Sequence, residues 1–88
     1  MMSIGGGVRH GVAKNPNTSP ETLALLANDE AYNVRSYVAY NPNTSSETLE
    51  RLANDDYYGI HVAVTKNPNT PQYIKDYLKI KEFLNYYV

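Results

Sequence analysis

The sequence predicts an all-α fold: a short α-solenoid of about three 26-residue repeats, each with two helices, and a longer C-terminal capping helix. Three observations predict it. The tetrapeptide Asn-Pro-Asn-Thr occurs three times at a constant spacing of 26 residues. Apolar residues coincide when the sequence is shifted by this period. Within each unit the apolar residues recur at helical spacing. A fixed period of this size is typical of supersecondary units that stack and share one core.

The motif divides the chain into units of one domain, residues 1–88. We expect a partial repeat 1–14, repeat units 15–40 and 41–66, and a last motif with its capping helix at 67–88. A chain of this length buries little surface as a compact globule, so stability must come from stacking. The proline ends one helix, the threonine begins the next, and the first asparagine is expected to fasten the turn between them. The motif residues with these structural roles are Asn15, Pro16, Thr18, Asn41, Pro42, Thr44, Asn67, Pro68 and Thr70.

The first helix of each unit follows the motif. Thr18 is the predicted N-cap, and Glu21, three residues later, completes a capping box; Thr44 and Glu47 repeat the pattern. Apolar residues at i, i+3 and i+4 predict one buried face, formed by Leu23, Leu26 and Ala27 and by Leu49, Leu52 and Ala53. Asn28 and Asn54 are expected to end the helix because asparagine tolerates the left-handed conformation.

The second helix of each unit is predicted over roughly residues 31–40 and 57–66, with Asp29 and Asp55 as N-caps. Its buried line is Val34 and Val38 in one unit and Ile60 and Val64 in the next. Residues 32–38 are also rich in strand-forming side chains, but a helix is favoured. Because each element has only about nine residues, one helix of each pair is allowed to be partly 3₁₀.

The two ends depart from the repeat. Glycines fill the first helix, which is therefore expected to be short or frayed: Gly5, Gly6, Gly7 and Gly11. At the other end, Pro71 is predicted at the first position of a helix that continues to about Tyr86. Its apolar seam, expected to cover the last unit, is Tyr73, Tyr77, Ile80, Leu84 and Tyr87.

These repeats resemble the leucine-rich repeat variant family, whose units look like Asn-Pro-Asn-Thr-Pro followed by a Glu/Leu-rich helix, an Asp and a Val-Arg pair. The resemblance covers roughly residues 8–78. The matching residues are Asn41-Pro42-Asn43-Thr44, Glu47, Leu49, Leu52, Ala53, Asp55 and Val34-Arg35. It implies a right-handed, HEAT-like superhelix of alternating α and 3₁₀ or short α helices and a general role in protein binding, with no catalytic residues. Some family members carry a cysteine-rich iron–sulfur segment. This chain has no cysteine, so no cofactor is expected.

Composition excludes several functions. The formal charge is −1 and no block of like charge occurs, so neither nucleic acid nor an anionic membrane is attracted by net field. No apolar run is long enough to span a bilayer and no secretory leader is recognisable, so a cytoplasmic location is expected.

His10 and His61 lie two repeats apart and cannot share a metal. The pairs Asp29-Glu30 and Asp55-Asp56 suit helix capping better than carboxylate catalysis. No metal site, catalytic residue or enzyme activity is predicted.

Function is therefore sought at positions that vary between repeats. The candidate partner-binding face consists of tyrosine and basic residues: Arg9, Lys14, Tyr32, Arg35, Tyr37, Tyr40, Tyr58, His61 and Lys66. Tyrosine and arginine are enriched in interface hot spots, which favours a protein or peptide partner. Two alternatives stay open: the rings pack between units with no partner, or the basic strip binds nucleic acid. A homodimer through the solenoid ends is also expected, at Tyr86, Tyr87 and Val88.

Overall fold

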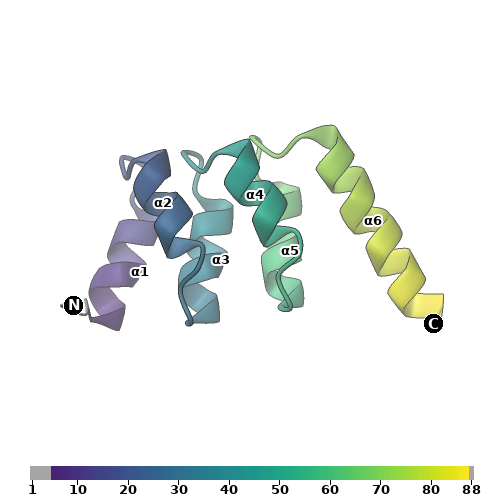
Figure 1. Ribbon diagram of the computed structural model, residues 1–88, viewed down its shortest axis with the longest axis horizontal. Coiled ribbons are helices and arrows are strands. Elements are labelled where there is room, and N and C mark those ends of the chain that lie inside the picture. The colour runs from purple at the N-terminus through teal and green to yellow at the C-terminus, as the bar shows by residue number, and fades with distance from the viewer. Residues whose placement is uncertain (1–4, 88) are drawn as a thin grey trace.

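The computed structural model describes residues 5–87, without the side chain of Tyr87, and shows an all-α repeat fold with no strand in this part of the chain. Figure 1 labels the helices in chain order. Their bounds are α1 Gly6–Lys14, α2 Pro20–Leu26, α3 Tyr32–Tyr40, α4 Ser46–Leu52, α5 Tyr58–Lys66 and α6 Gln72–Tyr87.

The helices form two layers along one long axis. The odd-numbered helices α1, α3 and α5 lie side by side, while α2 and α4 form a second layer over them and α6 closes the C-terminal end (Figure 1). The molecule measures 44 × 23 × 17 Å. Helices α3 and α5 each pack against the odd helix before them and the even helix that precedes them in the chain. This is the predicted short helical solenoid with a longer C-terminal helix.

The core lies between the two layers and follows the repeat period. The predicted buried lines Val34–Val38 and Ile60–Val64 are buried. So are Leu23 and Leu49 on the even helices. Ala13 and Ala39, both 0% exposed, fill the contacts between successive odd helices, where only a small side chain allows close approach.

The even helices begin one residue later than predicted. Ser19 is the N-cap of α2, and its Oγ accepts a hydrogen bond from Thr22 N at 3.2 Å. Ser45 caps α4 in the same way. The predicted N-caps were therefore wrong, as were their capping boxes: Thr18 with Glu21 and Thr44 with Glu47.

The motif threonines bind the preceding helix instead. Thr18 Oγ1 donates to Val12 O at 2.7 Å, and the same bond recurs from Thr44 to Val38 O and from Thr70 to Val64 O, both at 2.6 Å. Each hydroxyl thereby gives a second donor to a carbonyl in the last turn of an odd helix, which also accepts from the backbone N–H of the C-cap asparagine. Because the threonine hydroxyl bonds to this carbonyl of the preceding helix, it does not cap the helix that follows.

The turns between even and odd helices also differ from the prediction. No residue in the described chain has a positive φ, so Asn28 and Asn54 do not end their helices in the left-handed conformation. The helices instead tighten through i→i−3 bonds such as Asn28 N to Leu25 O at 3.1 Å. Ala31 and Tyr57 are the N-caps of α3 and α5.

Asp29 and Asp55 sit two residues before these N-caps. Asp29 Oδ1 accepts from Ala31 N at 2.9 Å, and Asp55 Oδ1 accepts from Tyr57 N at 3.1 Å. The aspartates therefore fasten the turn that leads into each odd helix and are not its N-caps. Their second carboxylate oxygens are left for other contacts.

The helices in residues 5–87 are all α, so the 3₁₀ geometry that the sequence allowed for one helix of each repeat does not occur there. Two further expectations, both about helix ends, were wrong. Helix α1 is as long as α3 and α5 despite its glycines, because α3 packs against it. Pro71 precedes α6 and accepts from Ile74 N and Lys75 N through its carbonyl, which places it at the cap position.

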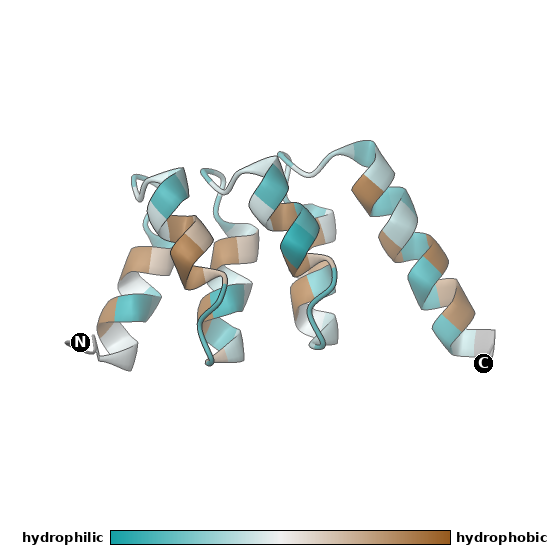
Figure 2. Cartoon of the chain, in the orientation of Figure 1, coloured by the Kyte–Doolittle hydropathy of each residue, from teal (hydrophilic) through white to brown (hydrophobic). Residues whose placement is uncertain are grey.

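Helix α6 is continuous, as predicted, but a different face of it packs on the stack. Its buried residues are Ile74 and Leu78. Apolar residues recur along α6 almost to its end (Figure 2). The predicted seam is exposed at Tyr73, Tyr77, Ile80 and Leu84. Tyr87 falls outside the described side chains. Most of the seam therefore forms an outer apolar face, and its contact with the preceding unit includes the bond from the Tyr77 hydroxyl to Asn54 Oδ1 at 2.7 Å.

None of the helices in residues 5–87 is long and apolar enough to cross a lipid bilayer.

Candidate functional site

The asparagine that opens each motif joins neighbouring repeats. Asn41 Oδ1 accepts from Asn43 N at 2.8 Å, which is the predicted turn bond. Its Nδ2 donates to Ala13 O at 2.8 Å and to Asn15 O at 2.9 Å, both in the preceding repeat. Asn67 makes the equivalent bonds to Ala39 O and Asn41 O.

These amides are buried: Asn41 is 3% exposed and Asn67 1%. A buried amide with its donors and acceptor satisfied inside the protein has a structural role. The sequence pointed to the turn but could not show the second role, because a period alone does not reveal which carbonyls face the amide. The side chains of Asn41 and Asn67 are therefore used inside the stack and are not exposed to a ligand.

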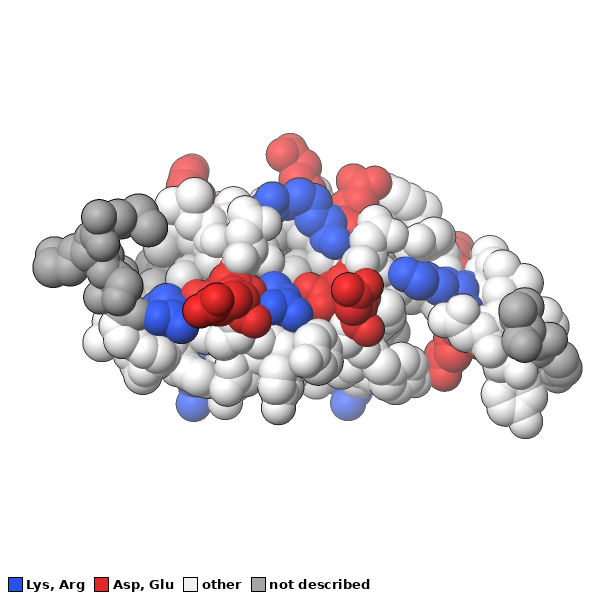
Figure 3. Space-filling model, turned by 60° about the horizontal axis from the view of Figure 1, so that its bottom comes forward, with Lys and Arg blue, Asp and Glu red and all other residues white. Residues whose placement is uncertain are grey.

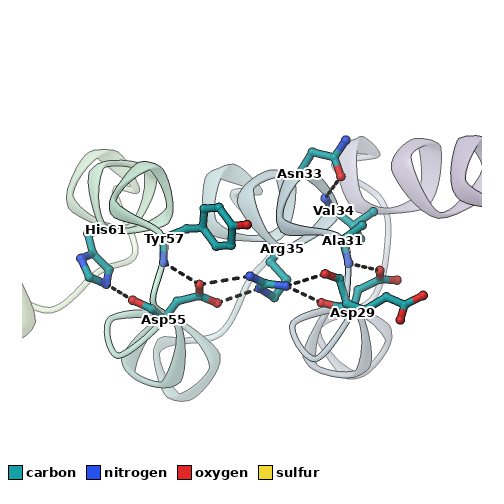
Figure 4. Close-up of polar contacts among 9 residues, drawn as sticks. Asp29, Ala31, Asn33, Val34, Arg35, Asp55, Tyr57 and His61 are labelled. Atoms are coloured by element: carbon teal, nitrogen blue, oxygen red, sulfur yellow. Dashed lines mark hydrogen bonds and ion pairs between the residues drawn. The ribbon is translucent and has the colours of Figure 1, made fainter.

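Two arginine–aspartate contacts, here called the Arg–Asp clips, also join successive repeats. Arg35 Nε donates to Asp55 Oδ2 at 2.7 Å and Nη2 to Oδ1 at 3.2 Å, while Nη1 binds Asp29 O at 2.7 Å (Figure 4). The first clip is Arg9 to Asp29, at 2.7 Å. A bidentate arginine–carboxylate pair fixes orientation as well as distance.

The clips form a charged line on one face of the stack. Figure 3 shows basic and acidic side chains alternating along the long axis. Arg35 and Asp55 expose only 14% and 11% of their side chains, so water screens this pair less than a surface pair. Arg9 and Arg35, predicted as partner contacts, are thus held within the stack.

His61 occupies the place of these arginines in the third repeat. Its Nε2 contacts Asp55 O, as Arg35 contacts Asp29 O in the unit before (Figure 4). The described residues place no carboxylate within ion-pair distance of His61. No group of three or more His, Asp or Glu side chains in residues 5–87 is arranged as a metal site.

The candidate tyrosines separate into different environments. Tyr37 is half-buried: its ring meets His10 edge-on at 5.3 Å, and Lys14 Nζ lies 5.2 Å from its centroid. Tyr32 stacks on Tyr57 at 4.7 Å. These rings bridge successive odd helices, which supports the alternative that some tyrosines pack between units.

Tyr58 is exposed on α5 and donates through its hydroxyl to Glu82 Oε1 on α6 at 3.0 Å. This hydrogen bond to a carboxylate, followed by the charge of Glu82 and by burial, raises the pKa of Tyr58 above its ordinary value. The proton is retained because the phenolate would face a second negative charge.

Three of the predicted residues form a row that we call the edge row: Lys14, Tyr40 and Lys66. They are the last residues of α1, α3 and α5, and all three are exposed. Because the odd helices are side by side, the row runs along one edge of the stack. Tyr32 and Tyr58 are the first residues of α3 and α5 and therefore lie at the opposite edge.

The nine predicted residues therefore do not form one patch. The structure groups them as an exposed edge row, a bridging tyrosine at position 37, and an opposite edge where the clips and the first-turn tyrosines lie. The apolar outer face of α6 was missed as an exposed surface. Its signal was present in the sequence, because α6 carries apolar residues on more of its circumference than one buried face requires.

Comparison with protein-family models gives two adjacent matches to one description, leucine rich repeat variant, at residues 6–31 and 32–56. Together they span more than half of the chain. Each matched unit begins at an odd helix, so it has the period of the Asn-Pro-Asn-Thr motif with a different starting point. Searches of curated proteins and of solved structures gave no match.

Proposed function

Because the chain belongs to the leucine-rich repeat variant family, a type of structural helical repeat, we propose that it is a non-enzymatic module for protein–protein interaction or scaffolding. One observation carries the proposal. The buried motif residues Asn41, Asn67, Thr44 and Thr70 bond inside the stack, whereas the edge row is exposed and reads Lys, Tyr, Lys along the repeats. Recognition needs side chains that are exposed and differ along the surface.

The edge row has suitable chemistry for a partner surface. Tyr40 is 46% exposed between two lysines at equivalent positions on the neighbouring helices. A tyrosine supplies apolar area and a hydroxyl at low entropic cost, and flanking lysines favour an acidic partner. Tyr37, next to Lys14, extends the surface inward.

Binding of nucleic acid is less well supported than binding of protein. A basic strip on the odd helices would need Arg9, Lys14, Arg35 and Lys66. Both arginines are paired with aspartates, and their charges are compensated. Two lysines release few counterions, so the expected affinity for a phosphate backbone is weak at physiological salt.

The proposal is tested with an edge-row variant, Tyr40→Ala combined with Lys66→Glu. Immobilised wild-type protein and variant are used to capture partners from cell extract, and each capture is quantified against Leu25→Ala, which removes a 74% exposed apolar side chain on α2, as a control. Losing one hot-spot tyrosine costs about 1–2 kcal/mol, so specific partners should drop roughly tenfold on the variant and persist on the control. Equal capture on all three proteins would contradict the placement.

We also propose self-association through the outer face of α6. Its exposed apolar side chains are Tyr73, Tyr77, Ile80 and Leu84. Tyr86, expected at a dimer contact, is exposed on the same helix, whereas the side chain of Tyr87 and Val88 lie outside the described residues. A two-fold axis would bury this face against its own copy, which is the commonest way in which proteins pair.

A further inference from the structure

Helix α5 has a face that the other odd helices bury. Ala13 on α1 and Ala39 on α3 are each 0% exposed, because the next odd helix lies against them. Thr65 stands at the same place on α5 and is exposed. A polar residue replaces alanine where the described chain supplies no further odd helix. The uncovered side of α5 therefore corresponds to the surface with which α1 and α3 each contact the next odd helix.

A groove of about 440 Å³ lies beside this face, between α5 and α6. Its walls include Val62 and Thr65 from α5 and Leu78 and Lys79 from α6. In the earlier repeats, the corresponding spaces hold α3, between α1 and α2, and α5, between α3 and α4. The groove therefore lies at the position in the repeat where the next odd helix packs in the earlier units; we call such a space a seat.

The charge of the groove differs from that of the occupied seats. Each occupied seat is closed by an Arg–Asp clip, with the aspartate two residues before the N-cap of the incoming helix. In the third repeat His61 replaces the arginine, and the residue 26 positions after Asp55 is Lys81.

The groove also carries excess positive charge. Its basic lining residues are His61, Lys66, Lys75, Lys79 and Lys81, and its acidic ones are Asp76 and Glu82. Both acids are already engaged, because Gln72 donates to Asp76 and Tyr58 donates to Glu82. The seat is therefore cationic and has no carboxylate in the position that the clips use.

We propose that the groove between α5 and α6 binds, in trans, an amphipathic helix of a partner protein that is preceded by an aspartate. The carboxylate pairs with His61 and Lys81, and the apolar side of the helix packs on Val62 and Leu78. Charge complementarity and continuity with the repeated contact between odd helices identify this occupant. The inference rests on the proposed role in protein binding and assigns it a second site, which shares only Lys66 with the edge row.

The sequence argues against a second copy of this chain as the occupant. Its first described helix, α1, would be the element to dock, but in the sequence Ser3 stands where Asp29 and Asp55 precede α3 and α5. An α1 helix therefore brings no carboxylate to His61. An aspartate-led helix from another protein does.

The probe is a synthetic peptide with the sequence of residues 27–41, which contains Asp29 and the segment that packs on α1 as α3. It is titrated into the isotope-labelled full chain while backbone amide shifts are followed by nuclear magnetic resonance. We expect saturable shifts at Val62, Thr65 and Lys79, with a dissociation constant on the order of 100 μM, because a short peptide must order itself on binding.

Two variants decide whether the clip chemistry operates. His61→Arg restores the residue of the earlier repeats and should tighten binding about fivefold, since a bidentate arginine replaces one imidazole. Lys81→Glu should weaken binding about tenfold, as should an Asp29→Asn peptide, because each removes or opposes one member of the charge pair. Thermal melting of both protein variants checks that the fold is unchanged.

These experiments distinguish an error in the groove proposal from an error in the edge-row proposal. Tyr40→Ala alone, which changes the edge row but no residue that lines the groove, should bind the peptide as wild type does. Three results would overturn the proposed binding of a helix in the groove: no shift at millimolar peptide, shifts confined to other helices, or equal affinity for the Asp29→Asn peptide. If His61→Arg changed the sedimentation of the protein without peptide, a second copy would occupy the groove and the partner-helix proposal would be wrong.

Discussion

Single residues in this chain differ in role even when they occupy the same place in the repeat. Asn15 and Asn41 both fasten their own turn, since Asn15 Oδ1 accepts from Asn17 N at 2.9 Å as Asn41 Oδ1 does from Asn43 N. Only Asn41 also reaches a preceding repeat. Comparing variants of the two asparagines therefore separates the contribution of the turn bond from that of the bonds between repeats.

Asn41→Ala should lower the free energy of unfolding by about 3 kcal/mol, because the turn bond and two inter-repeat hydrogen bonds are lost and buried Ala13 O loses its donor. Asn15→Ala, which removes only the exposed turn bond, should cost about 1 kcal/mol or less. Asn41→Asp keeps the turn acceptor but points oxygen at two carbonyl oxygens, so it should be at least as destabilising as alanine. Urea denaturation measures all three. Equal losses for the two alanine variants would mean that the inter-repeat bonds contribute nothing.

Tyr58 offers a prediction with a defined pH dependence. Because its pKa is raised in the folded protein, the bond to Glu82 contributes to stability below the ordinary tyrosine pKa and is lost as pH rises through the raised value. Glu82→Gln should return the pKa of Tyr58 toward its ordinary value. Titration of the labelled ring carbons by nuclear magnetic resonance measures the pKa, and Tyr58→Phe assigns the signal. An unchanged Tyr58 pKa in Glu82→Gln would exclude the contact in solution.

At the scale of the helices, the apolar period and the prolines predicted where each helix lies, because both signals are local. The caps were mispredicted for a tertiary reason. Thr18 has a good local role, but the carbonyl of Val12 is a competing acceptor that exists only once the helices pack. Ser19, the actual cap, has no such competitor. The clips escaped prediction for the same reason: the repeat period aligned Arg35 with Arg9 but could not pair either with an aspartate.

Helix α1 gives the clearest test of propensity against packing. A Cβ added at Gly11 meets no atom within 4 Å, so alanine would fit without strain. Gly11→Ala should therefore stabilise the protein by about 0.5–1 kcal/mol by reducing the entropy lost on forming the helix. Gly5→Ala is the matched control: Gly5 is the N-cap, where alanine is disfavoured, and it should not stabilise. Thermal and urea unfolding measure both. A loss of stability in Gly11→Ala would show that this helix face is covered in solution.

The whole molecule is quasi-one-dimensional, since each repeat touches only its neighbours. The protection of backbone amides from hydrogen exchange therefore depends on the position of each helix in the stack. Helix α3 is flanked on both sides by odd helices, whereas α1 has one such neighbour, and Val8 on α1 is 58% exposed although its counterparts Val34 and Ile60 are buried. The sequence could place these residues in register but not state which copies lack a neighbour's cover.

Amide hydrogen exchange should consequently be slowest in α3 and faster toward α1 and the second half of α6, because the ends open without disrupting the centre. Self-association changes one part of this profile. If the outer face of α6 pairs, protection of residues 80–86 should rise with protein concentration while that of α1 stays constant, and sedimentation velocity should show a dimer. Ile80→Lys combined with Leu84→Lys should abolish both effects and leave α3 unchanged, since these side chains are exposed in the single chain. A concentration-independent profile with a monomeric sedimentation coefficient at millimolar protein would eliminate the dimer and leave the α6 face to other partners.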